Sequence, residues 1–357
     1  MTSNTTTVPA DPTLWSDVLG RLLRREALPA DLTERALGAI LAGAATDAQI
    51  AGFAVGLRAK GETAAELAAL VRTMRRHAAS VPYPVGGTLV DTCGTGGDRS
   101  GTVNVSTTAA LVVAGAGATV AKHGNRAASS QCGSADVLEA LGVVIDLGPA
   151  GAARCLDEAG IAFCFAPVYH PAMRFVGPVR RELGVPTTFN FLGPLANPVG
   201  VRRQAVGVSD PAMAPIVLGA LRELGAERVL VFYGHDGLDE LTTTTTSTVL
   251  ELRDGEERRY EVDPEALGFA RAEPRALVGG DAAGNAAAVH QVLAGRGGPV
   301  RDIVVLNAAA GLVAAGLADD LAEGTVVAAA AIDDGRAAAT LDAFVRVSVA
   351  AREQASG

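Results

Sequence analysis

A glycine-rich segment with acidic ends is the densest group of residues in this sequence that could bind a ligand. The segment Asp91-Thr92-Cys93-Gly94-Thr95-Gly96-Gly97-Asp98 follows an apolar run of strand length and places three glycines within four residues. Without Cβ atoms in the way, backbone N–H groups can approach an anion closely. Shortly afterwards, Asn104-Val105-Ser106-Thr107 opens a predicted helix whose free N–H groups and positive dipole end suit a phosphate. A glycine cluster alone is more often an ordinary turn, but the hydroxyl-rich helix start favours a phosphate site.

A second group of polar residues follows the next predicted strand, which ends in Lys122-His123-Gly124-Asn125-Arg126. Lysine occurs only twice in this arginine-rich chain, at Lys60 and Lys122. A lysine kept at a strand end indicates a required ammonium, a compact charge that suits phosphate; the alternative is a solvated basic turn. Ligands of open α/β sheets bind at the carboxyl ends of the strands. Two polar loops at that edge therefore favour a polyphosphate site.

Adjacent carboxylates at Asp239-Glu240 are the candidate metal ligands. Mg²⁺ is usually bound by one or two protein carboxylates together with waters and substrate phosphates. A lone Asp-Glu pair is usually a solvated turn, and it gains weight here from the phosphate loops. The five histidines fit no Ser-His-Asp, Cys-His or zinc arrangement. We therefore predict no covalent nucleophile or general base, but a transferase that stabilises a good leaving group electrostatically.

The elements that must position these groups fall into two parts. Residues 14 to about 80 have helical periodicity, and two capping boxes begin at Thr46 and Thr63. After the Pro- and Gly-rich break near residue 82, strand-length apolar runs alternate with helices, which indicates a mostly parallel sheet. We predict an α/β protein with a small N-terminal helical domain, 12–82, and a large α/β domain, 87–350. Residues from 169 to about 183 look helical, and Gly-Pro and Asn-Pro in 187–198 predict turns.

Composition narrows the class of protein. The chain is 49% hydrophobic and carries a net charge of −9, which favours a packed core and disfavours nucleic-acid binding. We find no transmembrane run and no secretory signal, and the four cysteines have no CxxC spacing. We therefore expect a cytoplasmic protein with free thiols that binds no membrane.

Taken together, the motifs resemble those of the anthranilate phosphoribosyltransferase family. The matching segments, in the family's order, are DTCGTGGD, NVST, KHGNRAASSQCGSAD, AMRFVGPVRRELGVPTTFNFLGPLANP and GLDE, followed by Gly279-Gly280-Asp281 with Asn285 and by RDIVVLNAAAGL. The resemblance implies transfer of the phosphoribosyl group of 5-phosphoribosyl 1-diphosphate (PRPP) to the amine of anthranilate, with release of diphosphate. It also implies a homodimer formed through the helical domain, with a helical insertion near 169–190 packed on that domain.

The same resemblance implies the residues of the site. PRPP would contact the two polar loops, at Gly94, Gly97, Asp98, Thr102, Asn104, Val105, Ser106, Thr107, Lys122, His123, Gly124, Asn125, Arg126, Ala127, Ala128, Ser129, Ser130 and Ser134. Anthranilate would contact Gly94, His123, Asn125, Tyr169, His170 and Arg180, with Arg180 facing its carboxylate. Ser106, Asp239 and Glu240 would hold Mg²⁺, as two ions. Arg99 and Cys132 depart from the family pattern without removing a binding group.

Two other functions compete with this one. A pyrimidine-nucleoside phosphorylase would share the architecture, but its phosphate loop has a basic, imidazole-bearing approach, whereas Thr92-Cys93 precede this loop. A non-catalytic relative that binds nucleic acid would have lost the GTGGD loop or the acidic pair and would have a basic surface. This chain keeps both motifs and is acidic, so both alternatives are disfavoured.

Overall fold

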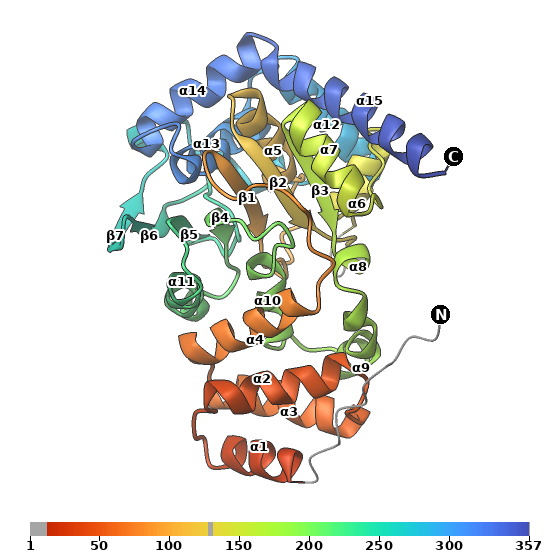
Figure 1. Cartoon of the computed structure of the whole chain (residues 1–357). Helices are drawn as coiled ribbons and strands as arrows, with labels where there is room; N and C mark the ends of the chain where they lie inside the picture. Colours follow the sequence, from red (N-terminus) through yellow and green to blue (C-terminus); the bar gives the residue numbers. More distant parts are fainter. Residues whose placement is uncertain (1–12, 128–130, 357) are drawn as a thin grey trace.

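The N-terminal part of the molecule is a group of short helices. The computed structural model describes residues 13–127 and 131–356. The first helices are α1 (Leu14–Leu23), α2 (Ala30–Leu41), α3 (Asp47–Lys60) and α4 (Ala64–Arg76), at the lower end of the molecule in Figure 1. Both predicted capping boxes are present, with the Thr46 and Thr63 hydroxyls accepting from the N–H groups of Gln49 and Glu66. Gly61, at φ 90°, ends α3 as a residue tolerant of that geometry should.

The central sheet confirms the mostly parallel arrangement predicted from the sequence. Among the described residues it has seven strands in the order β3-β2-β1-β4-β5-β6-β7. Their bounds are β1 Leu89–Gly94, β2 Thr119–Gly124, β3 Ile161–Phe165, β4 Arg203–Gly207, β5 Arg228–Gly234, β6 Ser247–Arg253 and β7 Glu256–Val262. The first five are parallel, and β6 and β7 form an antiparallel hairpin that turns at Asp254-Gly255. The carboxyl ends of β1, β2, β4 and β5 therefore share one edge.

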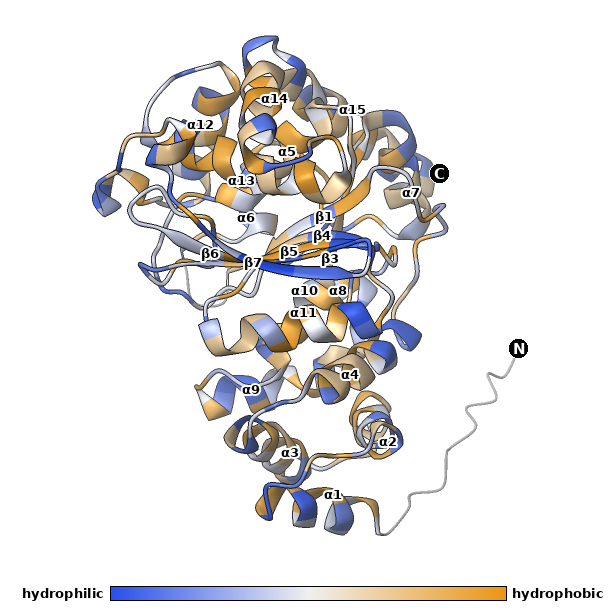
Figure 2. Ribbon diagram, turned by 90° about the vertical axis from the view of Figure 1, so that its left-hand side faces the viewer, coloured by the Kyte–Doolittle hydropathy of each residue, from blue (hydrophilic) through white to orange (hydrophobic). Residues whose placement is uncertain are grey.

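Helices cover both faces of the sheet (Figure 2). The upper layer contains α5 (Val105–Gly115), α6 (Ser134–Ala140), α7 (Pro149–Ala159), α12 (Ala282–Leu293), α13 (Pro299–Ala315), α14 (Leu321–Asp333) and α15 (Arg336–Ser356). The lower face is covered by α10 (Phe189–Leu195) and α11 (Ala214–Glu223), with α4 beneath them. Short helices complete the chain, namely α8 (Ala166–Tyr169), α9 (Gly177–Leu183), η1 (Pro171–Phe175), η2 (Pro211–Met213), η3 (Glu265–Leu267) and η4 (Pro274–Leu277). No helix in the described ranges is long and apolar enough to span a bilayer.

The lower hydrophobic core joins the N-terminal helices to the sheet. Alternate residues of β5 point to opposite faces, so Leu230 and Phe232 enter the upper core while Val229 and Val231 enter the lower one. The lower core is continuous from those strand residues through α10 and α11 to α1–α4. The helical part is thus packed against the sheet's lower layer as one hydrophobic unit.

The segment from residue 166 to 198 departs from the sequence prediction in one respect. Turns are predicted at Gly193-Pro194, but the structure forms α10 there, with Pro194 inside the helix. Proline removes one helical hydrogen bond, and this loss is offset because Phe189, Phe191 and Leu192 are buried in the lower core. Nearby, α9 lies against α3, and η1 lies against α2.

Candidate substrate and metal site

The glycine-rich loop leaves β1 at Gly94 and is fastened to the end of β4. Gly96 and Gly97 have φ of 66° and 85°, the left-handed region that glycine adopts without strain. Thr95 donates its N–H to Gly207 O at 3.0 Å. Ser209 donates its N–H to Thr95 Oγ1 at 3.1 Å and its hydroxyl to Gly96 O at 2.8 Å. The loop is therefore held at the carboxyl edge of the sheet.

The acidic pair lies directly on this edge. Asp239 Oδ2 accepts from Gly96 N at 2.6 Å, and Glu240 Oε1 accepts from Ser106 N at 3.2 Å. Gly94 and Gly207 are partners across β1 and β4, and a Cβ atom on either would overlap Asp239. Both positions thus need glycine because the acidic loop passes so close. The two N–H groups both donate to side-chain carboxyl oxygens at this edge, so the loop and the helix start point their donors toward the same place.

Burial sets the protonation behaviour of the pair. It raises the pKa of Asp239 to about 7, with a further contribution from the nearby Asp98 carboxylate. Burial, followed by repulsion from Asp239, raises the pKa of Glu240 well above its usual range. A hard divalent cation bound between these two carboxyl groups would offset their repulsion and favour their ionised forms. The residues present therefore fit Mg²⁺.

Asn307 of α13 holds the acidic loop from behind. Its Oδ1 accepts from Leu241 N at 2.9 Å, and its Nδ2 donates to Leu241 O at 2.8 Å and to Ile303 O at 2.8 Å. Leu241 immediately follows Glu240, so this side chain fixes the backbone next to the carboxylate. Asn307 is part of the RDIVVLNAAAGL motif, but no sequence pattern assigned it this role.

Lys122 lies beneath the glycine loop. Its ammonium donates to Thr92 O at 2.6 Å and to Ser106 Oγ at 3.4 Å, and the residue is 3% exposed. Burial lowers the pKa of Lys122, while Asp91 and the acidic pair oppose that shift. The lysine is thus a buried cation next to the first turn of α5, rather than a solvated one.

Asp91, at the start of the glycine motif, was assigned no individual role from the sequence. Its carboxylate accepts from His123 N at 3.2 Å and from Asn197 Nδ2 at 2.8 Å. Burial raises the pKa of Asp91 to about 6, and Lys122 works in the opposite direction. Asp91 therefore links β1, the strand end at His123 and the Asn-Pro turn.

The second polar loop, after β2, is held by its own helix. Ser134 donates to Asn125 O at 3.1 Å, and Arg126 forms ion pairs with Asp136 and Glu139 at 2.8 and 2.9 Å. Arg126 is thereby engaged with α6. Ala127 N also donates to Asp136, while Ala128, Ser129 and Ser130 lie outside the described residues.

Asn104 connects the two polar loops. Its Nδ2 donates to Cys132 O at 3.1 Å, and its Oδ1 accepts from Asn285 Nδ2 at 2.8 Å. Two neighbouring side chains predicted for PRPP, Val105 and Thr107, are 2% exposed, so they face the interior. Asp98 accepts from Ser100 Oγ at 2.7 Å within the glycine loop. Thr102 pairs with Val278, which ties the end of that loop to the η4 segment.

The residues predicted for anthranilate are only partly brought together. The rings of His123 and His170 lie 5.1 Å apart, and His123 Nδ1 is 2.8 Å from Gly193 O. Burial lowers the pKa of His123 to about 3 and that of His170 to about 4. Tyr169 is elsewhere: its ring is in the upper core and its hydroxyl donates to Leu147 O at 2.9 Å. Arg180, on α9, has a pKa lowered by burial, and its guanidinium makes no hydrogen bond or ion pair within the described residues.

Comparison with known proteins identifies the family. The model of the glycosyl transferase family a/b domain matches residues 86–338, and that of its helical bundle domain matches residues 16–78. Anthranilate phosphoribosyltransferase of Thermobifida fusca is 53% identical over 345 residues, which cover 95% of this chain and 98% of that protein. The enzyme of the same name from a Nocardioides species is 55% identical over 336 residues, 93% of this chain and 98% of its own.

The chain belongs to the anthranilate phosphoribosyltransferase family. Solved structures of anthranilate phosphoribosyltransferases share its fold. The protein from Thermus thermophilus is 42% identical with a TM-score of 0.87, covering 93% of this chain and 99% of that one. The Saccharomyces cerevisiae protein in complex with PRPP and Mg is 26% identical with a TM-score of 0.85, covering 95% and 99%. These matches confirm the resemblance and the fold predicted from the sequence, and they favour this family over both alternatives.

Proposed function

We propose that this chain transfers the phosphoribosyl group of PRPP to the amine of anthranilate and releases diphosphate. The observation that carries the proposal is the acidic pair seated on the glycine loop, with Asp239 and Glu240 bound to the N–H groups of Gly96 and Ser106. That arrangement joins a metal-type donor set to two anion-binding loops at one sheet edge. Relatives of 53–55% identity that carry the name of this activity support the same assignment.

The reaction needs charge stabilisation more than proton transfer. Breaking the bond between ribose C1 and diphosphate builds negative charge on the leaving group. Backbone N–H groups of the glycine loop and of the α5 start would stabilise it, with the buried Lys122 ammonium just beneath. Ser106, Asp239 and Glu240 would hold Mg²⁺, as two ions, and Mg²⁺ would neutralise phosphate charge.

Anthranilate would be positioned by cationic and neutral groups on the other side of the site. Arg180 is a partly buried guanidinium whose pKa burial lowers, which fits a group that receives a carboxylate. The imidazoles of His123 and His170 are uncharged at neutral pH because burial holds their pKa values near 3 and 4. An aromatic amine is unprotonated at neutral pH, so its lone pair can attack C1 without a strong base.

The oligomeric state and compartment complete the proposal. A homodimer through the helical domain is supported by large exposed apolar side chains on α1 and α3, Leu23 at 86% and Val55 at 43%. A cytoplasmic location is supported by the buried thiols Cys93, Cys155 and Cys164, which form no disulfide within the described residues.

The decisive experiment follows loss of anthranilate fluorescence when PRPP and Mg²⁺ are added to the purified protein. The Asp239→Ala/Glu240→Ala double variant should lose at least about 10³-fold in turnover, because Mg²⁺ supplies several kcal/mol of charge stabilisation. A matched control is Glu256→Ala/Glu257→Ala, an adjacent acidic pair on the exposed strand β7. Wild-type turnover by the first variant in chelator would contradict the proposal, as would an inactive wild-type protein.

A further inference from the structure

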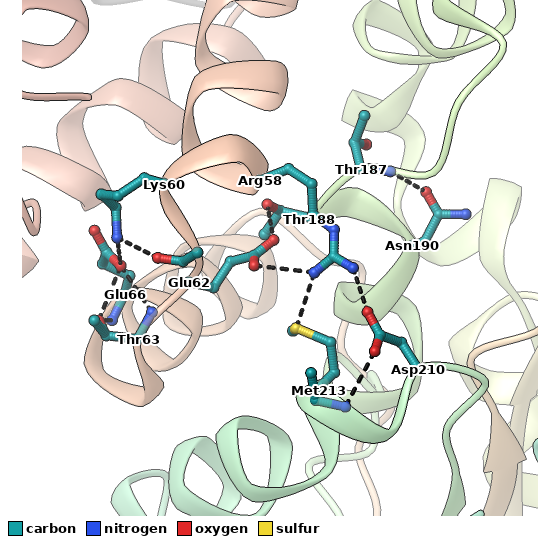
Figure 3. A network of polar contacts seen from close by, with 12 residues as sticks. Arg58, Lys60, Glu62, Thr63, Glu66, Thr187, Thr188, Asn190, Asp210 and Met213 are labelled. Carbon is teal, nitrogen blue, oxygen red and sulfur yellow. Dashed lines mark hydrogen bonds and ion pairs between the residues drawn. The ribbon is translucent and has the colours of Figure 1, made fainter. Parts of the chain in front are cut away.

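Arg58 lies at the junction of the helical part and the sheet, where it joins three segments (Figure 3). From the last turn of α3, Nη1 donates to Glu62 Oε2 at 3.2 Å and contacts Met213 Sδ at 3.2 Å, while Nη2 donates to Asp210. The guanidinium also lies over the Phe191 ring, 5.2 Å from its centroid. One planar side chain thus touches the α3–α4 turn, the segment after β4, and α10.

On the Asp210 side, the network leads to the glycine loop. Asp210 directly follows Ser209, whose hydroxyl and N–H hold Gly96 and Thr95. Gly96 in turn donates to the Asp239 carboxylate at 2.6 Å. The Arg58–Asp210 ion pair is therefore one residue from the contacts that fix the loop beneath the acidic pair.

On the Glu62 side, the network leads to α10. The Glu62 side chain is 1% exposed, and its Oε1 accepts from Thr188 Oγ1 at 2.5 Å. Thr188 precedes α10, and near the far end of that helix Gly193 O receives His123 Nδ1. The backbone around Glu62 is also fixed, because the buried ion pair Lys60–Glu66, at 2.8 Å, joins the two ends of the α3–α4 turn.

One cation neutralises two carboxylates at this junction. Arg58 is the shared cation of two carboxylates, and a buried carboxylate such as Glu62 is costly without it. Because the guanidinium of Arg58 is rigid and planar and bonds to both Glu62 and Asp210, it fixes the distance between the α3–α4 turn and the segment after β4. A contact to only one of the two carboxylates would not do so.

We infer that Arg58, with Asp210 and Glu62, is a positioning group that holds the glycine loop in register with α10 and the helical part. The inference rests on the proposed function, in which the glycine loop carries PRPP and His123, held by Gly193 O of α10, lies on the anthranilate side. In this proposal Asp210 acts through the adjoining Ser209, and Glu62 acts through Thr188. Arg58 joins the two carboxylates. The network thereby sets the alignment of the amine with ribose C1.

The test variant is Asp210→Asn, which removes the charge but keeps an oxygen for the N–H of Ala212. We expect kcat to fall about tenfold, since small misplacements of reacting groups are costly. Each KM should stay within about twofold, because ground-state contacts are kept. Hydrogen–deuterium exchange should quicken in residues 94–98 and 188–193 together, with the melting temperature little changed.

The matched control is Glu34→Gln. Glu34 also pairs with arginines, Arg72 and Arg76, and its side chain is 25% exposed against 32% for Asp210, but its partners lie within the helical part. This variant should leave kcat and loop exchange unchanged. In the double variant Arg58→Gln/Asp210→Asn, kcat should fall by less than the product of the two single losses, because both single variants break the same ion pair. The melting temperature should fall as well, because the buried Glu62 carboxylate loses its cation.

Unchanged exchange in Asp210→Asn, or faster exchange with kcat within twofold of wild type, would overturn the inference. Additive losses in the double variant would do so as well. If the wild-type protein consumes no anthranilate, the proposed function fails, and the exchange measurement by itself then decides whether the network holds the loop.

Discussion

At the scale of single residues, this chain reserves lysine for enclosed positions. Lys60 forms an ion pair with Glu66 in which the two side chains are 4% and 0% exposed. Lys122 is 3% exposed and donates to a main-chain carbonyl. An ammonium is compact, whereas the broad guanidinium needs room for five donors. Both lysines of this arginine-rich chain thus lie where little space is available.

Arg180 provides a test of anthranilate recognition at this scale. Arg180→Ala should raise the KM for anthranilate by about 10- to 100-fold, because charged hydrogen bonds typically contribute about 1.5–3 kcal/mol. The KM for PRPP should change little. Steady-state kinetics with each substrate varied gives both values. Arg181→Ala, on the exposed neighbour in α9, is the control. If the KM for PRPP rises instead, Arg180 belongs to the phosphate side.

The buried imidazoles give the protein a pH dependence of stability. The pKa of His170 is lowered from 6.5 to about 4, chiefly by burial, so the folded state favours the neutral ring. The stability this provides is complete above about pH 6.5 and is lost as pH falls through about 4. In His170→Asn, the free energy of unfolding should fall less between pH 6.5 and 4 than it does in the wild-type protein, by on the order of 3 kcal/mol. Urea unfolding of both proteins between pH 4 and 7 measures it, and parallel curves would contradict the assignment.

At the scale of elements, α13 acts on the site through the contact between Asn307 and Leu241. Asn307→Ala leaves the Leu241 N–H and carbonyl unpaired, which should cost about 2–4 kcal/mol of unfolding free energy. It should also raise the Mg²⁺ concentration for half-maximal turnover severalfold, since Glu240 is no longer held. Thr325→Ala, a largely buried hydroxyl on α14 that bonds within its own helix, is the control. A Mg²⁺ requirement equal to wild type would separate Asn307 from the metal site.

Elements defined by local pattern were predictable, and those defined by distant contacts were not. The capping boxes at Thr46 and Thr63 follow from neighbouring residues, and the structure confirms them. Helix α10 was predicted wrongly because the burial of its aromatic residues outweighs the local effect of Pro194. The role of Asn307 depends on a partner 66 residues away. For Arg58 and Asp210, 152 residues apart, the sequence contains no signal.

At the scale of the whole molecule, the lower core makes the N-terminal helices dependent on the rest of the chain. Leu67, Leu70 and Val71 of α4 share that core with Val217 and Leu221 of α11. A fragment of residues 13–82 should therefore melt without a cooperative transition, because much of its apolar surface has lost its partner. Circular dichroism during heating, compared with the full chain, tests this. A sharp, reversible transition in the fragment would show an independent folding unit.

The same shared core has a consequence for the order in which the protein is made. The ribosome completes α4 at Arg76, but α11 ends only at Glu223, roughly 150 residues later. At typical elongation rates the nascent helices wait about 7–30 s with an apolar face uncovered. During that interval the uncovered apolar face can bind chaperones or the same helices of another nascent chain. Synonymous codon changes that slow translation between residues 80 and 220 should accordingly lower the yield of folded protein without altering a single amino acid.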